Sequence, residues 1–443
     1  MKTLITNTTI LTMGLEKSIL ENAPVAIDQG QIWGVGIIPP YFHPDEIVDG
    51  YGCVLMPAFF NAHTHAAMTL ERGWAEDLAF EDWLNKKIWV AESALEEEDI
   101  YWGASLAAVE MIQSGIVGFA DHYFWMDQVA RVVSDCGMKA LLAWCHFGNG
   151  VDQELGKKSF EDTISFVERW KNGAGGRIKT SMGPHSTYMD PPDVLQNFAR
   201  EALRLGVGAH IHLSESLEQV QNSRKKFGKT PVAHLDELGL LCLPEPTIVA
   251  HCNVLETEDY ELLSRNSVFV AHTPKTYMKL AMDMPLVEKM HQQGIRVALG
   301  TDGPASNSDF NMWEMMRLTG LCQKFIHNDP TVMDRTSLVE MATRIPAMAM
   351  GFSDSGIIQV GNKADLILVD TSSPHMIPRH DLVAGLVYSG QPGDVRAVWC
   401  DGVCLYKNGN FLTLDYERIC YEAEKRAFRL TGKEMKNMRT YNA

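Results

Sequence analysis

The stretch Val54-Leu-Met-Pro-Ala-Phe-Phe60 runs directly into Asn61-Ala-His-Thr-His65, and this combination does most to define the fold. A short apolar run bounded in this way is typical of a buried β-strand. Alternate residues of a strand face the same side, so His63 and His65 are expected to point together. A doubly wound open sheet, the alternative architecture, would need a glycine-rich phosphate turn after its first strand. The stretch therefore predicts a buried strand with two histidines at its carboxyl end.

Seven further apolar runs follow, separated by longer amphipathic stretches. The runs are Ile116–Ala120, Ala140–Cys145, Ile178–Met182, Val207–Ile211, Thr247–Ala250, Val268–Ala271 and Arg296–Leu299. Asp190–Leu205, Met282–Gly294 and Asn311–Phe325 carry apolar residues at helical spacing. Eight strands alternating with helices over about 250 residues match a (β/α)8 TIM-like barrel in length and count, whereas a doubly wound sheet usually has fewer strands.

Both chain ends consist of short β-prone runs broken by turn residues. The runs are Thr3–Thr12, Ala26–Asp28 and Gln31–Ile37 near the start, and Gly356–Asp370 (strand, turn, strand), Val395–Cys400 and Val403–Lys407 near the end. Asp401-Gly402, between the last two runs, is a strong hairpin signal. We expect both ends to build one small β-sandwich, followed by a helix in Tyr416–Arg429. The expected division is 1–55 and 353–443 for this β-domain and 56–352 for the catalytic barrel.

Composition narrows the partners of the chain, which has 443 residues and a net charge of −17. An anionic surface repels phosphate backbones and acidic membranes, which argues against nucleic acid and membrane partners. No apolar stretch reaches the roughly 18 residues of a membrane span, and the first residues show no signal-peptide pattern. Nine scattered cysteines without a CxxC pair indicate reduced thiols. These features predict a cytoplasmic protein that acts on a small molecule.

Residues with chemical function gather where the predicted barrel strands end. In strand order they are His63 and His65, Asp121 and His122, Cys145 and His146, His185, His212, His251, His272 and Asp302. Eight of the 15 histidines of the chain belong to this set. The carboxyl ends of parallel barrel strands open at one mouth, where such enzymes place their chemistry. A lone histidine after a strand is more often a core or loop residue, but this repetition indicates a site.

Four of these residues form a donor set for a metal ion. His63 and His65 share one side of the first strand, while His212 and Asp302 follow strands five and eight. Imidazoles together with a carboxylate suit Zn²⁺ or Fe²⁺ and leave a position for water. The sequence therefore predicts a metal site with three nitrogen ligands and one oxygen ligand.

These motifs resemble the amidohydrolase superfamily, specifically its metal-dependent aminohydrolase branch. The similarity covers Pro57-Ala-Phe-Phe-Asn-Ala-His-Thr-His65, Met182-Gly-Pro-His-Ser186, His212-Leu-Ser-Glu215, Ala250-His-Cys252, Leu299-Gly-Thr-Asp-Gly303 and Gly361-Asn-Lys-Ala-Asp365. The pattern is most similar to that of the 5-methylthioadenosine/S-adenosylhomocysteine deaminases, with the triazine hydrolases as neighbours. The resemblance implies one divalent ion per chain, zinc or alternatively iron, bound by His63, His65, His212 and Asp302.

The resemblance also implies catalytic roles. Glu215 would be the proton shuttle, His251 would orient or polarise the attacking water, and Asp302 would assist proton transfer to the departing ammonia. A bound divalent ion yields hydroxide from water near neutral pH. When this hydroxide attacks the ring carbon, negative charge develops on a ring nitrogen, and an acid must deliver a proton there. The alternative for Glu215 is a solvated helix start, where the helix dipole favours an acidic residue.

Four residues are expected to contact the substrate. In the deaminases that this chain resembles, the counterparts of Trp83 and Glu92 contact the nucleoside, and the carboxylate holds two ribose hydroxyls. His185 matches a residue near the purine ring, with a supporting role as its alternative. Ser306 would offer a hydroxyl to the substrate, or else be an ordinary loop serine. The alternative for Glu92 is a solvated helix start, because Glu96-Glu97-Glu98-Asp99 follows it.

The chain departs from the deaminase pattern in two places. Leu141–Phe147 and Gly148–Gly150 contain no arginine, where relatives that accept S-adenosylhomocysteine place arginines for its carboxylate. His272 is followed by Thr-Pro rather than by Asn-Pro. These changes argue against S-adenosylhomocysteine and leave 5-methylthioadenosine, adenosine or a different aminated heterocycle.

We therefore expect hydrolytic deamination of an adenosine-type nucleoside to the inosine-type product and ammonia. The first alternative is an aminohydrolase or chlorohydrolase for another N-heterocycle, such as a triazine, pterin or pyrimidine. The second is an inactive barrel with a structural role, although all four ligands and Glu215 are present. The oligomeric state is left open, a homo-oligomer included.

Overall fold

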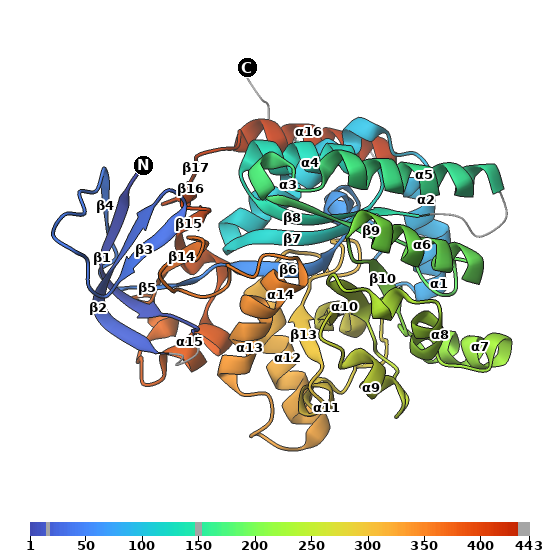
Figure 1. Cartoon of the computed structure of the whole chain (residues 1–443). Helices are drawn as coiled ribbons and strands as arrows, with labels where there is room; N and C mark the ends of the chain where they lie inside the picture. Colours follow the sequence, from blue (N-terminus) through green and yellow to red (C-terminus); the bar gives the residue numbers. More distant parts are fainter. Residues whose placement is uncertain (15–17, 147–152, 433–443) are drawn as a thin grey trace.

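The computed structural model describes residues 1–14, 18–146 and 153–432. Eight parallel strands in two four-stranded sheets lie within it (Figure 1). The first sheet contains β6 (Phe59–Thr64), β7 (Ile116–Tyr123), β8 (Lys139–Cys145) and β9 (Ile178–Gly183). The second contains β10 (His210–Leu213), β11 (Thr247–His251), β12 (Val268–His272) and β13 (Arg296–Leu299). These strands confirm the predicted strand succession of an α/β fold.

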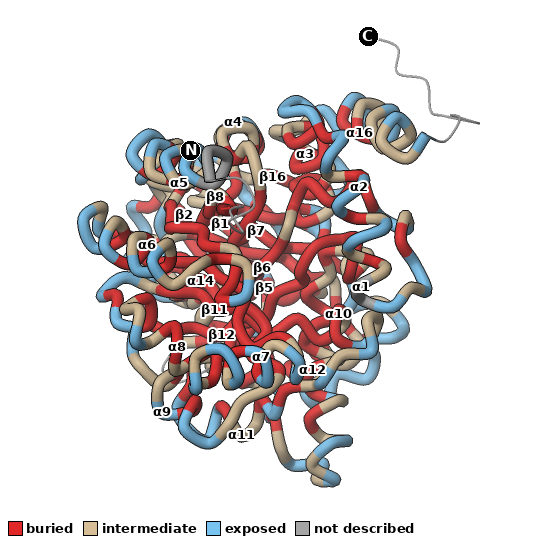
Figure 2. The backbone as a smooth tube through the Cα atoms, turned by 90° about the vertical axis from the view of Figure 1, so that its right-hand side faces the viewer, coloured by how far each residue is buried: buried red, intermediate tan, exposed pale blue. Residues whose placement is uncertain are grey.

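Hydrogen bonds link the two parallel sheets on both sides. Met182 of β9 forms a parallel bridge with Ala209, just before β10. After β13, the amide of Asp302 donates to the carbonyl of His63 at 2.9 Å. The carboxyl ends of the strands therefore gather at one end of the assembly. The strands are almost entirely buried, as the centre of Figure 2 shows.

Helices cover the strands, and α6 (Pro192–Leu205) shows how local sequence sets them. Pro192 occupies the first helical position, where its missing N–H costs nothing. Gly206, with φ of 62°, ends the helix in a left-handed conformation. Its buried face carries Leu195 and Phe198. Further helices of this part are α3 (Glu97–Ser114), α4 (Met126–Cys136), α5 (Gln153–Trp170), α7 (Leu217–Phe227), α8 (Pro231–Glu237), α9 (Asp259–Leu263), α10 (Pro274–Lys279), α11 (Val287–Gln292), α12 (Met312–His327), α13 (Arg335–Ala342) and α14 (Arg344–Ala349).

The predicted first barrel strand, Val54–Phe60, is wrong as a single strand. The structure has β5 (Cys53–Pro57) and β6, which belong to different sheets. Between them the amide of Ala58 donates to the carbonyl of Asp365, and the amide of Phe59 donates to that of Gly115, both at 3.0 Å. Both strands are fully buried, so the apolar run shows no break where the pairing partner changes.

Nine strands from both chain ends form one mixed sheet. Its order is β17 (Asn410–Phe411), β16 (Val403–Lys407), β15 (Val395–Cys400), β14 (Leu366–Asp370), β5, β1 (Thr3–Leu11), β2 (Ile19–Asp28) and β3 (Gln31–Val35), with β4 (Glu46–Asp49) beside β1. The two ends meet where β5 pairs antiparallel with β14. Ile5, Val25, Leu366 and Trp399 share one apolar core, so strands from both chain ends share one sheet and one core.

The predicted strand-turn-strand in Gly356–Asp370 is only half right. β14 forms, but the residues before it make loop contacts instead of a strand. The amide of Ala364 donates to the carbonyl of Gly30 at 3.0 Å, and the amide of Ile358 donates to that of Thr12 at 2.8 Å. Ile358 and Ala364 of this loop are buried in the core that the N-terminal strands share, which explains the strand-like pattern.

Two helices in the C-terminal part of the described chain pack on other parts of the molecule. α15 (Leu382–Ser389) precedes β15, and α16 (Tyr416–Thr431) lies beside α3 (Figure 1). Ile419 of α16 packs with Trp102 and Val109 of α3. Arg426 lies 3.5 Å from Asp99 at the start of α3. The predicted terminal helix is confirmed.

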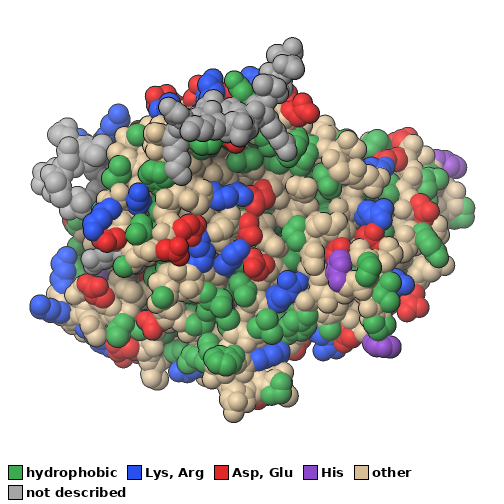
Figure 3. All heavy atoms as spheres, turned by 180° about the vertical axis from the view of Figure 1, so that it is seen from behind, with side chains coloured by type: hydrophobic (Ala, Val, Ile, Leu, Met, Phe, Trp, Pro, Cys, Tyr) green, Lys and Arg blue, Asp and Glu red, His purple; other side chains and the backbone are tan. Residues whose placement is uncertain are grey.

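Two surface properties bear on partners. Within the described ranges, no helix combines the length and apolar character that a membrane span needs. On the face drawn in Figure 3, basic and acidic side chains are interspersed, so the net charge of −17 is not gathered there into one acidic patch.

Candidate active site

Three histidines and one aspartate converge at the carboxyl ends of the strands. His63 is the second-last residue of β6, which ends at Thr64, and His65 follows the strand directly. His212 lies in β10, and Asp302 comes three residues after the end of β13. Nε2 of His65 lies 3.4 Å from Asp302 Oδ1 and 3.4 Å from His212 Nε2. Nε2 of His63 lies 3.8 Å from the same carboxylate oxygen. The structure thus brings together the four residues that the sequence predicts as metal ligands.

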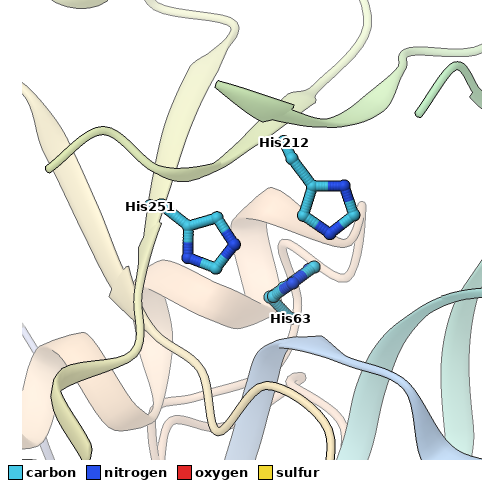
Figure 4. A group of neighbouring side chains, drawn as sticks. All are labelled: His63, His212 and His251. Atoms are coloured by element: carbon cyan, nitrogen blue, oxygen red, sulfur yellow. The ribbon is translucent and has the colours of Figure 1, made fainter. Parts of the chain in front are cut away.

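His251, the last residue of β11, joins this cluster. One ring nitrogen from each of His63, His212 and His251 lies within 4.8 Å of the others, and Figure 4 shows the three rings gathered around a common space. Nε2 of His63 is buried and has no hydrogen-bond partner among the described residues. Burial lowers the pKa of His212 and of His251 to about 4, so these rings are neutral and offer lone pairs. Neutral imidazoles beside a carboxylate fit a divalent metal ion.

The backbone around the cluster adopts conformations that side chains normally avoid. φ is positive at Ser214 (49°), His251 (78°) and Asp302 (64°). Each such residue costs on the order of 1–3 kcal/mol, and such residues concentrate at functional sites. Thr64 Oγ1 donates to the Asp302 carbonyl at 2.9 Å, and the Gly303 amide donates to Asp302 Oδ1 at 2.7 Å. These hydrogen bonds fix the direction of the carboxylate.

Glu215 lies beside the cluster, shortly after β10. Its Oε1 is 3.7 Å from His251 Nε2, and its Oε2 accepts from Gln219 Nε2 at 3.2 Å. Asn253 Nδ2 donates to the Glu215 carbonyl at 3.0 Å. Burial raises the pKa of the Glu215 carboxyl group. The group is buried, so it does not belong to the solvated helix start that was its alternative, and the upward shift moves its pKa in the direction that a proton carrier requires.

A pocket opens over the cluster and has an empty volume of about 760 Å³ including its mouth. This size is ordinary for a small-molecule site. Short helices form one wall, namely η1 (Ala66–Glu71), α1 (Phe80–Trp83), η2 (Leu84–Ile88) and α2 (Trp89–Glu92). The lining includes Trp83, Glu92, His185, Ser306, Glu215, His251, Asp302, His65 and His212. Every sequence-predicted site residue except the buried His63 therefore faces this one pocket.

Glu92 lies beside the hydroxyl group of Tyr123 and near a second buried acid, Glu71. Glu92 ends α2, and the Tyr123 hydroxyl donates to its Oε1 at 2.7 Å. Burial raises the pKa of Glu92 to about 7, although the Tyr123 hydrogen bond opposes the shift. The side chain is placed in the pocket wall, not on the solvated helix start that Glu96 and Glu97 begin in α3.

A buried acid supports the loop that carries His185. Asp190 Oδ2 accepts from the His185 amide at 2.6 Å, and Oδ1 lies 2.6 Å from His146 Nδ1. Ser306 is buried, and its hydroxyl donates to the Gly303 carbonyl at 3.1 Å. Both residues thus line the pocket from positions that hydrogen bonds hold in place.

Two residues at the site were not predicted from the sequence. Tyr123 contacts Glu92, and His210 lies 2.8 Å from His63 through Nε2 and Nδ1. His210 precedes His212 by two residues, which is the same spacing as His63 and His65, so strand alternation provides a signal for it. Tyr123 is the last residue of β7, after Asp121 and His122, and no such spacing marks it.

The similarity to known proteins extends over almost the whole chain. The model of the amidohydrolase family matches residues 54–405. A 5-methylthioadenosine/S-adenosylhomocysteine deaminase from Pelotomaculum thermopropionicum is 42% identical over 434 residues, which cover 97% of this chain and 99% of that protein. The solved structure of an adenosine deaminase from Xanthomonas campestris with bound zinc has a TM-score of 0.91 at 28% identity, covering 97% of this chain and 98% of that one.

A more distant structure shares the fold alone. Atrazine chlorohydrolase from Arthrobacter aurescens, complexed with zinc, is 22% identical with a TM-score of 0.87, covering 96% of this chain and 100% of that one. These matches show a TIM-barrel-like α/β fold and confirm the resemblance that the sequence motifs indicate. The chain belongs to the amidohydrolase family.

Proposed function

We propose that this chain hydrolytically deaminates an adenosine-type purine nucleoside to the inosine-type product and ammonia. The observation that carries the proposal is the buried carboxyl group of Glu215, which shares one pocket with His65, His212 and Asp302, three of the four proposed metal ligands. Relatives aligned over nearly the full chain are named as deaminases of such nucleosides. The same geometry argues against an inactive barrel, because the ligands and the proton carrier lie together.

We propose that His63, His65, His212 and Asp302 hold one divalent ion. Zinc is the first candidate, since it is bound in related solved structures, and iron(II) suits the same donor set. When bound, such an ion lowers the pKa of a coordinated water to about 7 and so supplies hydroxide at neutral pH.

The proposed proton carrier is Oε1 of Glu215. Oε2 is occupied by the Gln219 amide, which leaves Oε1 to take a proton from the attacking water and deliver it to the neighbouring ring nitrogen. Nδ1 of His251 lies 3.4 Å from Thr273 Oγ1, so its Nε2 is directed to the pocket, where it orients the water. Asp302 then assists proton transfer to the departing ammonia.

The proposed substrate contacts follow from the pocket wall. Trp83 offers an aromatic face and His185 lies toward the purine ring, while Ser306 offers a hydroxyl. Glu92 accepts hydrogen bonds from the two vicinal ribose hydroxyls through the oxygen that Tyr123 leaves free.

The charge of the pocket favours a substrate without a carboxylate. Its described lining contains the acids Glu92, Glu215 and Asp302 and neither lysine nor arginine. The segment in which relatives that accept S-adenosylhomocysteine place arginines includes residues 147–150, and these lie outside the described residues. We therefore propose 5-methylthioadenosine or adenosine, rather than S-adenosylhomocysteine, because an anionic group would lack a counter-charge.

We also propose that the two parallel sheets close into a (β/α)8 barrel and that the nine-stranded sheet folds into a small β-sandwich. The hydrogen bonds on both sides of the parallel sheets and the shared core of both chain ends support this. The proposed division is 1–55, 56–352 and 353–443, with β5 reaching Pro57 at the first boundary.

An ammonia-release screen of the zinc-loaded protein tests the activity. It compares adenosine, 5-methylthioadenosine and S-adenosylhomocysteine with adenine, triazines, pterins and pyrimidines. We expect the highest kcat/KM for the first two ribosides. Turnover of free heterocycles without turnover of ribosides would instead establish the alternative aminohydrolase or chlorohydrolase.

A further inference from the structure

His210 makes a direct contact with the first of the proposed metal ligands. It lies in β10, two residues before His212, and both His210 and His63 are fully buried. Nε2 of His210 lies 2.8 Å from Nδ1 of His63, and the rings meet edge to face with centroids 5.0 Å apart. A contact of this length between two ring nitrogens is a hydrogen bond, so one of them must carry the proton.

The two other histidine ligands show which nitrogen is protonated in a ligand ring. Nδ1 of His65 lies 2.7 Å from the carbonyl oxygen of His122, and Nδ1 of His212 lies 3.0 Å from that of His185. A carbonyl only accepts, so in both rings Nδ1 donates and Nε2 keeps its lone pair. This is the usual support of a metal-bound histidine.

The same assignment of the proton to Nδ1 applies to His63, but the partner of its Nδ1 is a side chain, His210, and not a carbonyl group. Its Nε2 is the nitrogen 3.8 Å from Asp302 and without a hydrogen-bond partner in the described ranges. If Nε2 binds the metal, the single proton of the neutral ring lies on Nδ1 and is donated to His210. Nε2 of His210 must then be unprotonated, with the His210 proton on Nδ1.

This arrangement is costly for the fold. Nδ1 of His210 is buried and has no hydrogen-bond partner in the described part of the chain. A buried polar atom left unpaired lowers the free energy of unfolding of the protein. A native structure that keeps such an atom usually does so for function.

We propose that His210 is a positioning residue that accepts the Nδ1 proton of His63, fixes the tautomer and direction of that ring, and thereby strengthens the metal site. The inference rests on the metal site proposed above. His122 supports the same arrangement, because its ring stacks on His210 with centroids 5.2 Å apart while its carbonyl accepts from His65.

Zinc affinity of the full-length chain, measured by competition with a chelator, tests the inference. His210→Leu removes the acceptor, and we expect the zinc Kd to rise about 10–100-fold, as is usual for loss of such a partner. His210→Gln has a similar volume and an amide oxygen near the position of Nε2, so we expect it to restore most of the affinity. His234→Leu is the matched control, since His234 is a buried histidine on α8 that stacks on Phe227, and its zinc Kd should not change.

Thermal unfolding of the metal-free proteins separates positioning from packing. We expect metal-free His210→Leu to be about as stable as wild type, because the unpaired Nδ1 of His210 is gone while Nδ1 of His63 loses its acceptor. Lower stability of metal-free His210→Leu with an unchanged zinc Kd would overturn the inference and make His210 structural. A wild-type chain that binds no zinc tightly would instead refute the proposed metal site itself.

If His210→Leu does not fold, ¹⁵N NMR of the histidines in the zinc-loaded wild type tests the inference directly, because it shows which ring nitrogens carry protons. The inference requires a proton on His63 Nδ1 and none on His210 Nε2. The reverse placement would overturn it.

Discussion

Among single residues, Glu215 lies close to the proposed ligands without being one of them. Glu215→Gln keeps the shape of the side chain and leaves the four ligands in place, but it removes the group that carries the proton. We expect kcat to fall at least about 100-fold, the lower end for a general acid–base group, with unchanged zinc content. Steady-state kinetics together with metal analysis measures both.

Glu218→Gln is the matched control, because Glu218 is exposed three residues further on. It should leave kcat unchanged. A fully zinc-loaded Glu215→Gln protein with near-normal kcat would transfer the proton role to another residue, with His251 or His185 the next to test.

A second residue-level prediction concerns Glu92, whose pKa burial raises to about 7. The group gains its charge as pH rises through this value, and a carboxylate binds two hydroxyls better than its protonated form does. We expect the ratio of kcat/KM for adenosine over 2′-deoxyadenosine to rise with pH across this range.

Glu92→Gln should lower kcat/KM for adenosine about tenfold or more and abolish the pH dependence of this ratio. Taking a ratio cancels the titration of groups that act on both substrates alike. A ratio that keeps its pH dependence in Glu92→Gln would assign the titration to another group and leave Glu92 a structural role.

Between elements, Lys139 joins the start of β8 to the C-terminal strands. Its Nζ lies 2.5 Å from Asp365 Oδ2 and 2.7 Å from Asp401 Oδ1, and Lys139 and Asp365 are both buried. Lys139→Met fills the space but leaves Asp365 buried without a counter-charge. We expect the free energy of unfolding to fall by about 3–5 kcal/mol, as measured by urea unfolding.

The exposed pair of Lys157 and Glu161 provides a control within one helix, α5. Lys157→Met should change the free energy of unfolding by less than about 1 kcal/mol. Adding Asp365→Asn to Lys139→Met should recover part of the loss, because the buried charge is then removed. If Lys139→Met and Lys157→Met lowered the free energy of unfolding equally, the buried pair of Lys139 and Asp365 would not stabilise the contact between β8 and the C-terminal strands.

At the scale of the whole molecule, the proposed ligands come from both parallel sheets. His63 lies in β6 and His65 directly after it, while His212 lies in β10 and Asp302 in the segment after β13. Metal bound there stabilises the native chain relative to the unfolded one, by about 4 kcal/mol when free zinc is 1,000 times Kd. We expect removal of the metal by a chelator to lower Tm and one equivalent of zinc to restore it.

His212→Ala should show no zinc-dependent shift of Tm. Two tightly bound ions per chain, both needed for turnover, would contradict a single-ion site.

The sequence by itself determined the parts of this protein that depend on local periodicity. Apolar runs mark the strands because a strand buried on both faces must be apolar along its length. Histidines and acids at the ends of those runs mark the site because parallel strands bring their carboxyl ends together. His63, His65, His212 and Asp302 were therefore recognisable as one set, whereas the role expected of Glu215 came from the resemblance to the family.

Only the tertiary structure decided which buried groups meet across long separations. The apolar run around Ala58 does not show that β5 pairs with β14, more than 300 residues away, while β6 pairs with β7. His210 reaches His63 across 147 residues of sequence, and Tyr123 reaches Glu92 across 31. Periodicity states that a side chain is buried, but its partner follows from how separate strands and helices align, and no local pattern contains that alignment.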